Sequence, residues 1–375
     1  MGEMWDVVVA GAGPAGSLTA MLLARAGAEV LLVERSSWPR DKVCGGCLNP
    51  RGLGLLEARG VAMPCLEKFG GYGSMTLRGY GRCARLDLPA GVVVDRSVFD
   101  AELVEAAVVS GVRFRSECRV SSVCEGLDEV SVVLAEGGSE HRVRSRVLVD
   151  ASGIGSRVTP GAWERRGRLL VGLSATVDRS AWGGAAPDAG ELGMAVGREG
   201  YVGVVGLGVA GLHVSAAVDP AAVVSEGAGA AGVIDRLLRS AWPEVASGSG
   251  SVPQCSWRGT GLLNGRPVWA ARPRWFRVGD AAGYREPFTG EGMTRALVSA
   301  NRLSQLILGV RSGRVDAASA AAQWRSWCRA RHRGQWGCRV VSTLLRRRLI
   351  ARGCMEVLSV APGVARPLVR SLGKG

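Results

Sequence analysis

The chain has 375 residues, of which 47% are hydrophobic and 55 are glycine, so it is long enough for two intertwined domains and its composition excludes a disordered protein. Its formal net charge of +14 comes mostly from arginine and is spread along the chain, which fits a solvated basic surface as well as an anionic partner. No stretch approaches the ~18 apolar residues of a membrane span, and no nucleic-acid motif accompanies the charge, so we expect neither kind of protein.

The first elements form a β–α–β unit. Residues 5–10 are a valine-rich run of strand length, broken only by Asp6. A helix is predicted from Ser17 to Ala26 and ends at Gly27, and Val30–Val33 form a second buried strand. Such a unit with a short crossover is typical of a parallel sheet.

The pattern changes along the rest of the chain. Residues 36–60 are expected to be irregular and then helical, followed by a short strand at 92–94, a helix over 98–109, antiparallel strands over 113–123 and 130–134, and a buried strand over 147–150. Glycine-rich turns then separate short strands over 169–177, 192–196, 201–205 and 212–218, which predicts an antiparallel meander. A helix around 229–241, a strand over 274–279, a long helix over 289–308 and a basic, mostly helical remainder over 316–375 follow.

These patterns alternate, so we predict interleaved domains. A Rossmann-like α/β domain would use residues 1–75, 92–160 and 270–310. A substrate domain with an inserted antiparallel sheet would use 76–91 and 161–269, and a helical C-terminal region would use 311–375.

The other residue types point to a cytoplasmic protein without metal. Ten cysteines are scattered through a chain with no secretory signal, which predicts reduced thiols in the cytoplasm. His141, His213 and His332 do not stand at metal-ligand spacing, so we expect no metal site.

The turn after the first strand reads Gly11-Ala12-Gly13-Pro14-Ala15-Gly16. Gly11 permits the sharp turn, Gly13 lets the backbone approach a pyrophosphate, and Gly16 lets the helix pack on the sheet. The helix N-terminus then presents N–H groups to phosphates. Glu34, followed by Arg35, ends the second strand, where a carboxylate accepts hydrogen bonds from ribose. The turn predicts a dinucleotide site for NAD or FAD.

Two later strands also lead into glycine turns. The first turn contains Asp150, Gly153 and Arg157, and the second contains Gly279 and Asp280. A further stretch opens a helix and contains Pro287, Gly290, Gly292 and Met293. An acid at a strand end can bind a ribityl or ribose hydroxyl, and a glycine-rich helix N-terminus can bind phosphate or the anionic end of a reduced flavin.

Through these segments the sequence, over roughly residues 5–310, resembles the FAD-dependent family that unites aromatic-ring hydroxylases, flavin halogenases and geranylgeranyl reductases. The resemblance implies a p-hydroxybenzoate hydroxylase-like fold, with FAD bound along all three glycine segments. It also implies that Arg96, at the start of the 98–109 helix, reaches the cofactor; a surface salt bridge is the alternative for this arginine.

The stretch from Arg40 to Cys47 is similar to the lysine–x–cysteine–glycine–glycine stretch of geranylgeranyl reductases, in which the cysteine lies near the flavin. This similarity implies that Cys44 and Gly45 lie beside the ring, with Cys44 as the side chain nominated for catalysis and Glu291 as a weaker candidate. Two alternatives stay open for Cys44 and Cys47, namely small buried thiols and a redox pair.

Two departures from the family limit the functional prediction. The aromatic–proline, lipid-contacting stretch of the reductases is missing at 200–206, and the halogenase Trp-x-Trp-x-Ile-Pro element is absent together with any suitable lysine. We therefore predict an FAD-dependent, geranylgeranyl reductase-like enzyme that reduces C=C bonds of an isoprenoid, quinone or polyketide-like substrate with NAD(P)H as donor. An FAD monooxygenase acting on an aromatic or polyketide, and a non-catalytic flavin-binding partner, are the alternatives.

The C-terminal region is cationic with apolar neighbours, over residues 324–333 and 344–350. One interpretation is a helix that lies on a membrane surface and takes a hydrophobic substrate from lipid. The other, which we favour, is a capping helical bundle with a charged outer face.

Overall fold

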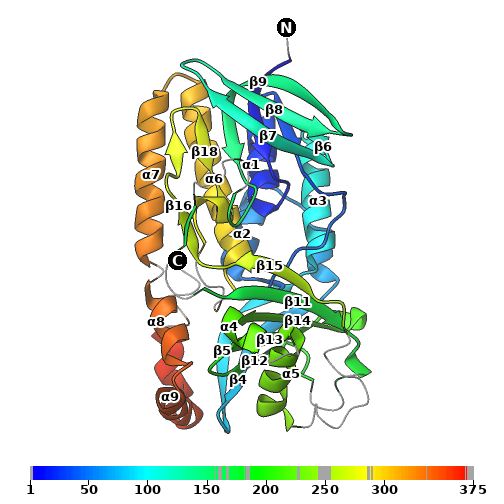
Figure 1. The fold of residues 1–375 in the computed structure, drawn as a ribbon, viewed down its shortest axis with the longest axis vertical. Coiled ribbons are helices and arrows are strands. Elements are labelled where there is room, and N and C mark those ends of the chain that lie inside the picture. Colours follow the sequence, from blue (N-terminus) through cyan, green and yellow to red (C-terminus); the bar gives the residue numbers. More distant parts are fainter. Residues whose placement is uncertain are drawn as a thin grey trace.

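The computed structural model describes residues 3–156, 158, 163–165, 169–180, 182, 186–225, 229–243, 255–284, 288, 290–334, 336–367 and 369. Two eight-stranded sheets organise this part of the chain, the first in the upper half of Figure 1 and the second in the lower half. The predicted α/β fold with an inserted antiparallel sheet is confirmed.

The first sheet has the order β17-β18-β9-β1-β2-β6. Its strands are β1 (Met4–Ala10), β2 (Val30–Val33), β6 (Arg113–Arg115), β9 (Ser139–Asp150), β17 (Ala271–Arg272) and β18 (Trp275–Arg277). The pairs β1–β2, β1–β9, β2–β6 and β9–β18 are parallel. An antiparallel ribbon of β7 (Cys118–Glu125) and β8 (Val130–Glu136) extends from β9. The carboxyl ends of β1, β2, β9 and β18 therefore meet at one edge.

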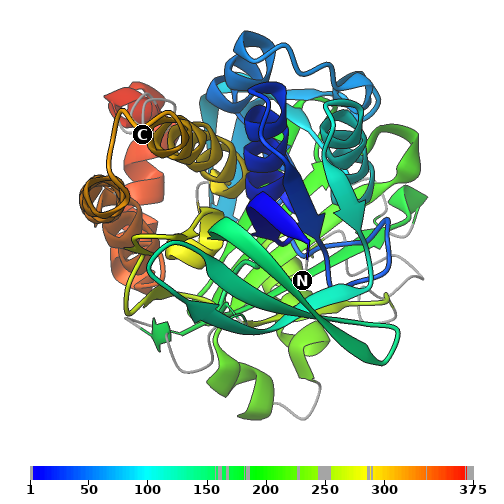
Figure 2. The same cartoon turned by 90° about the horizontal axis from the view of Figure 1, so that it is seen from above.

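Helices cover one face of this sheet and the β7–β8 ribbon covers the other, as Figure 2 shows from above. The helices are α1 (Pro14–Arg25), α2 (Pro50–Ala58), α3 (Arg96–Val109), α6 (Gly292–Arg311) and α7 (Ala317–Gly334). Alternate residues of β1 point to opposite faces, so Val7 and Val9 pack under the helices while Val8 and Ala10 pack under the ribbon. The indole N–H of Trp324 donates to the carbonyl of Arg277 at 2.9 Å, which fixes α7 to the sheet.

The second sheet has the order β15-β11-β14-β13-β12-β4-β5-β3. Its strands are β3 (Cys47–Leu48), β4 (Gly71–Gly79), β5 (Arg82–Val93), β11 (Val171–Val177), β12 (Glu191–Val196), β13 (Gly200–Gly206), β14 (Leu212–Val218) and β15 (Arg258–Leu262). Every pairing is antiparallel except that of β4 with β12. The amphipathic helix α5 (Gly229–Ala241) packs its apolar side on the far face, away from the first sheet.

The remaining elements are short or C-terminal. They are β10 (Trp163–Arg165), β16 (Gly265–Pro267), α4 (Pro220–Ser225), α8 (Trp336–Leu344), α9 (Arg348–Val360) and the 3-10 turns η1 (Pro64–Glu67), η3 (Gly208–Ala210), η6 (Gly279–Ala282) and η7 (Pro362–Ala365). No helix among the described residues is long and apolar enough to span a membrane.

Two secondary-structure predictions were wrong. Residues 113–123 are two strands in place of one, because Glu117 adopts a left-handed φ of 52° between β6 and β7. The long β4–β5 hairpin was missed apart from residues 92–94. The domain boundaries stay a prediction, although the second sheet includes residues 47–48, 71–75 and 92–93, which we had placed with the first domain.

Candidate active site

The turn between β1 and α1 is sterically closed to any residue but glycine at two positions. Gly11 has a φ of +108°, and a Cβ there would lie 2.5 Å from the carbonyl oxygen of Ala151. A Cβ on Gly16 would lie 1.9 Å from the carbonyl oxygen of Gly11. The turn and the first helical residues therefore pack directly on the backbone that follows β9.

The N-terminus of α1 is open to an anion. Its N-cap residue, Gly13, has no side chain to accept the first N–H groups, and the first turn contains no acid. The hydroxyl of Ser17, one turn into the helix, is buried without a hydrogen-bond partner among the described residues. The positive end of the helix dipole and the free backbone N–H groups therefore fit the phosphates of a dinucleotide.

Glu34 ends β2 as a buried carboxylate. It accepts hydrogen bonds from the N–H groups of Ala12 and Ser36, both at 3.1 Å, and lies 3.3 Å from Nε of Arg40. Burial alone would raise the pKa of Glu34, but Arg40 and the two N–H donors outweigh it and hold the pKa below its usual value. The neighbouring Arg35 is exposed.

Arg96 is buried, so the surface salt bridge considered for it is excluded. Its guanidinium binds Asp100 one turn later in α3 with two hydrogen bonds of 2.8 and 2.7 Å, and it also contacts the thiol of Cys44. Arg40 reaches the same carboxylate at 3.3 Å. Arg40 therefore links Glu34, after β2, to Asp100 in α3. Neither Arg40 nor Asp100 had been singled out from the sequence as a site residue.

Lys42 and Asp280 extend this charged cluster to η6. The position of a Cβ on Gly153 is 3.3 Å from Nζ of Lys42. Burial, followed by Arg96, lowers the pKa of Lys42, while Asp280 opposes the shift. Burial raises the pKa of Asp280 against the pull of Lys42 and Arg96. Gly279 also packs on Ala15, because a Cβ added to Gly279 would lie 2.8 Å from the methyl group of Ala15. Residues from all three glycine segments therefore lie close together.

Asp150 has partners of its own within the chain. Its carboxylate accepts hydrogen bonds from the N–H and hydroxyl of Ser152 and from the hydroxyl of Ser156, and it lies 3.4 Å from Nε of Arg277. These contacts give it a structural role in holding the glycine turn. A direct contact with a cofactor stays a prediction, and Arg157 and Pro287 lie outside the described residues.

The glycine loop from Cys44 to Cys47 lies between the second sheet and the start of α6. Nε2 of His213 on β14 donates to the carbonyl of Cys44 at 2.7 Å, which identifies the nitrogen that carries the proton. A Cβ on Gly46 would be 3.2 Å from the same ring. Burial lowers the pKa of His213, so the imidazole is neutral at physiological pH. The sequence showed no sign of this histidine's role, because its partner lies 169 positions earlier.

The start of α6 completes the cluster. The Cβ position of Gly290 is 3.8 Å from Cβ of Cys47, and the hydroxyl of Thr294 donates to Asn49 at 2.8 Å. Glu291 pairs with Arg295 at 2.5 Å and caps no N–H group. Gly292 and the buried Met293 therefore begin a helix whose N-terminus faces the glycine loop.

Comparison with known proteins identifies the ligand that this arrangement serves. Residues 4–167 match the family model described as FAD binding domain. The protein is an FAD-dependent oxidoreductase. The residues described above fit FAD, because an open helix N-terminus, a ribose-type carboxylate and a basic cluster follow one another from α1 to η6.

Curated relatives of this flavoprotein include a menaquinone reductase and a digeranylgeranylglycerophospholipid reductase. It is 27% identical over 338 residues to a menaquinone reductase of Mycolicibacterium smegmatis, an alignment that covers 84% of this chain and 78% of that protein. It is 36% identical over 159 residues to a digeranylgeranylglycerophospholipid reductase of Methanopyrus kandleri, covering 41% of this chain and 39% of that protein.

Solved structures of halogenases share the fold of the flavoprotein. The flavin-dependent brominase Bmp2 superposes with a TM-score of 0.79 at 20% identity, covering 99% of this chain and 93% of that one. The myxobacterial chondrochloren halogenase CndH gives a TM-score of 0.77 at 22% identity, covering 92% and 84%.

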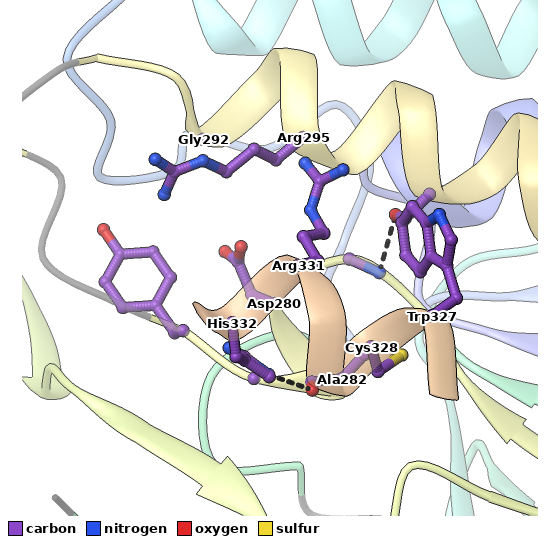
Figure 3. Close-up of a pocket in the computed structure, with 12 residues that line it drawn as sticks. Asp280, Ala282, Gly292, Arg295, Trp327, Cys328, Arg331 and His332 are labelled. Atoms are coloured by element: carbon purple, nitrogen blue, oxygen red, sulfur yellow. Dashed lines mark hydrogen bonds between the residues drawn. The ribbon is translucent and has the colours of Figure 1, made fainter. Parts of the chain in front are cut away.

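A small cavity of about 30 Å³ lies between η6, α6 and α7 in the flavoprotein. Figure 3 shows Asp280, Arg295 and Arg331 around it, with His332 below Arg331. His332 shares a hydrogen bond of 3.1 Å with the carbonyl of Ala282, and its ring occupies the position of a Cβ on Gly283. Burial, then Arg295 and Arg51, lower the pKa of Arg331 to about 10. A cavity of this volume has room for about two water molecules, which is too little for an organic substrate.

The thiol of Cys47 should resist alkylation at neutral pH. Burial, followed by Cys44, raises its pKa to about 12, so at pH 8 its thiolate fraction is ~10³-fold smaller than that of an ordinary exposed thiol. Iodoacetamide labelling read by peptide mass spectrometry should modify the exposed Cys83 and Cys124 first. Labelling of Cys47 should still rise above pH 10, where that of an ordinary exposed thiol has levelled off. Equal rates in the folded protein would contradict this expectation, and equal rates in urea are its control.

Proposed function

We propose that this flavoprotein is a reductase that saturates a C=C bond of a hydrophobic isoprenoid or quinone substrate, with NAD(P)H as its electron donor. The observation that carries the proposal is an apolar cluster on the face of the second sheet opposite α5. Its members are Leu77, Leu170, Val196, Tyr201, Ala217, Leu263, Leu345 and Met355, with Met194, Tyr284 and Phe288 packed against them.

This cluster lies next to the glycine segments. Phe288 belongs to the stretch between η6 and α6, and its ring meets that of Tyr201 on β13 edge to face, with centroids 5.1 Å apart. Ser215, two residues from both His213 and Ala217 on β14, lies 3.9 Å from the Cβ position of Gly45. An apolar substrate on this wall would thus lie beside the Cys44 loop and the start of α6.

The chain's own groups suit such a reaction. FAD, when bound and reduced, would supply a hydride to one carbon of the double bond, and a proton from solvent would complete the other carbon. The apolar wall would exclude water and orient the chain of the substrate. Neutral His213 positions the Cys44 loop through its single N–H. The open N-terminus of α6 would stabilise negative charge at the adjacent end of the site. The reductase relatives named above support the same reading.

Turnover without oxygen tests the proposal. Under anaerobic conditions, the FAD-loaded protein with NADH or NADPH should convert a menaquinone with a short isoprenoid chain to a product that has gained two hydrogens, detected by mass spectrometry. Free FAD under the same conditions is the control. A product formed only in air and carrying an added oxygen atom would reject the reductase and favour the monooxygenase. The halogenase-like structures support the fold alone.

The proposal includes contact with a membrane surface, where an isoprenoid substrate resides. In the described part of the C-terminal region, α7 packs on α6 as a capping helix, with Trp324 fully buried. The large apolar side chains that are exposed in this described part of the region lie from α9 onward.

A further inference from the structure

Helix α9 has two apolar sides. Its inner side, with Ala351 and Met355, is fully buried against β4 and β5. Its outer side exposes large apolar residues: Leu349 is 85%, Val357 53% and Val360 87% exposed, and Val364 in η7 is 63% exposed. Positions 349, 357 and 360 share one face of a helix. The described part of the chain therefore leaves these apolar side chains largely uncovered.

The charge around this face is positive. Arg347 and Arg348 are exposed at the start of α9, Arg352 is half-buried one turn later, and Arg366 follows η7. Glu356 is the sole acid of the sequence from 336 to 369, and it is bound to Arg82 of β5 at 2.6 Å. The rim therefore carries net positive charge, which disfavours a second copy of the same face and favours an anionic surface.

The attachment of α9 connects this face to the apolar cluster. Met355 and Cys354 belong to the same cluster as Tyr201 and Phe288. Tyr80 donates to the carbonyl of Arg346 at 3.0 Å and so anchors the start of α9 to the β4–β5 hairpin. The helix that exposes Leu349 and Val360 on one side thus forms part of the proposed substrate wall on the other.

We propose that the outer face of α9, formed by Leu349, Val357 and Val360 with Arg347, Arg348 and Arg352 at its rim, docks on an anionic lipid surface. The apolar side chains enter the interface and the arginines meet lipid phosphates. The purpose of this docking rests on the proposed function, since it would bring an isoprenoid from the bilayer to the apolar cluster around Tyr201. The docking itself does not depend on turnover.

Sedimentation with vesicles tests the docking. The full-length, FAD-loaded protein should bind vesicles of phosphatidylcholine with phosphatidylglycerol, and bind less tightly as salt increases. The double variant Leu349→Ser/Val360→Ser should bind at least about tenfold more weakly. Arg348→Gln/Arg352→Gln should lose about fivefold per arginine at low salt and nothing on pure phosphatidylcholine.

A matched control separates docking from general stickiness. Leu127→Ser/Val224→Ser also replaces one exposed leucine and one exposed valine, at 94% and 83% exposure, but far from α9. It should bind vesicles like the unaltered protein. Equal loss in both double variants, absence of vesicle binding, or self-association that disappears with Leu349→Ser would each overturn the proposal. Without vesicles, saturation of the C=C bond of a short-chain menaquinone should be unchanged in Leu349→Ser/Val360→Ser, so a failure of the reductase and a failure of docking give different results.

Discussion

Alanine in place of Gly16 should abolish FAD retention and lower the free energy of unfolding by about 3 kcal/mol or more. The added Cβ would lie 1.9 Å from the carbonyl oxygen of Gly11 and 3.0 Å from Cβ of Ala151, so either α1 or the turn must move. Movement of α1 displaces the N–H groups that fit the pyrophosphate. Flavin absorbance after gel filtration and urea denaturation of the apo-protein measure the two effects.

Gly54→Ala is the matched control for this substitution. Gly54 also lies within a helix, α2, but a Cβ there meets no atom within 4 Å. Alanine should stabilise that helix by about 0.5–1 kcal/mol and leave flavin binding unchanged. A Gly16→Ala protein that retains flavin as well as Gly54→Ala would contradict the closed turn described here.

Removing Arg96 should lower the free energy of unfolding about as much as Gly16→Ala does, because the carboxylate of Asp100 loses its closest cation. Arg96→Leu leaves Asp100, which is 1% exposed, with Arg40 at 3.3 Å as its remaining cation. Breaking a buried pair in this way costs about 3–5 kcal/mol, because one charge stays desolvated. The variant should also bind FAD more weakly, since the contact of Arg96 with Cys44 orders the glycine loop.

A double-mutant cycle gives this prediction its sharpest form. Arg96→Leu/Asp100→Leu removes both charges and should recover much of the stability lost by the single change. Arg239→Leu is the control, because Arg239 forms the same i,i+4 pair with Asp235 at 2.6 Å, but with 40% of its side chain exposed. It should cost far less than Arg96→Leu, because solvent screens an exposed pair. Equal costs at Arg96 and Arg239 in urea denaturation would reject the buried pair.

The local part of the fold could be predicted from the sequence. The β1–α1–β2 unit and α3 follow from apolar periodicity and short-range signals. One such signal in the structure is Asp95, which caps α3 by accepting a hydrogen bond from the N–H of Ser97 at 2.7 Å. The glycines at 11 and 16 follow from the same unit, because their roles depend on neighbours within one turn.

The remainder depends on contacts between distant segments. Strand β4 contains three glycines and no long apolar run, so its pattern is weak; it forms because β12 and β5 pair with it. Arg40, the second partner of Asp100, comes from a loop, and the partner of the Cys44 carbonyl comes from a strand; no spacing reveals either approach. His213 is an ordinary strand residue by sequence and becomes a site residue only because β14 faces the Cys44 loop.

The parallel pairing of β4 with β12 has a consequence for biosynthesis. The two strands are separated by more than a hundred residues, a span that includes β6, β7, β8 and β9 of the first sheet. During translation the β4–β5 hairpin emerges early, yet its β4 edge stays open until the chain beyond Glu191 has left the ribosome. The second sheet must therefore close after most of the first, and in that interval the unpaired β4 edge is where a nascent chain is exposed to wrong partners.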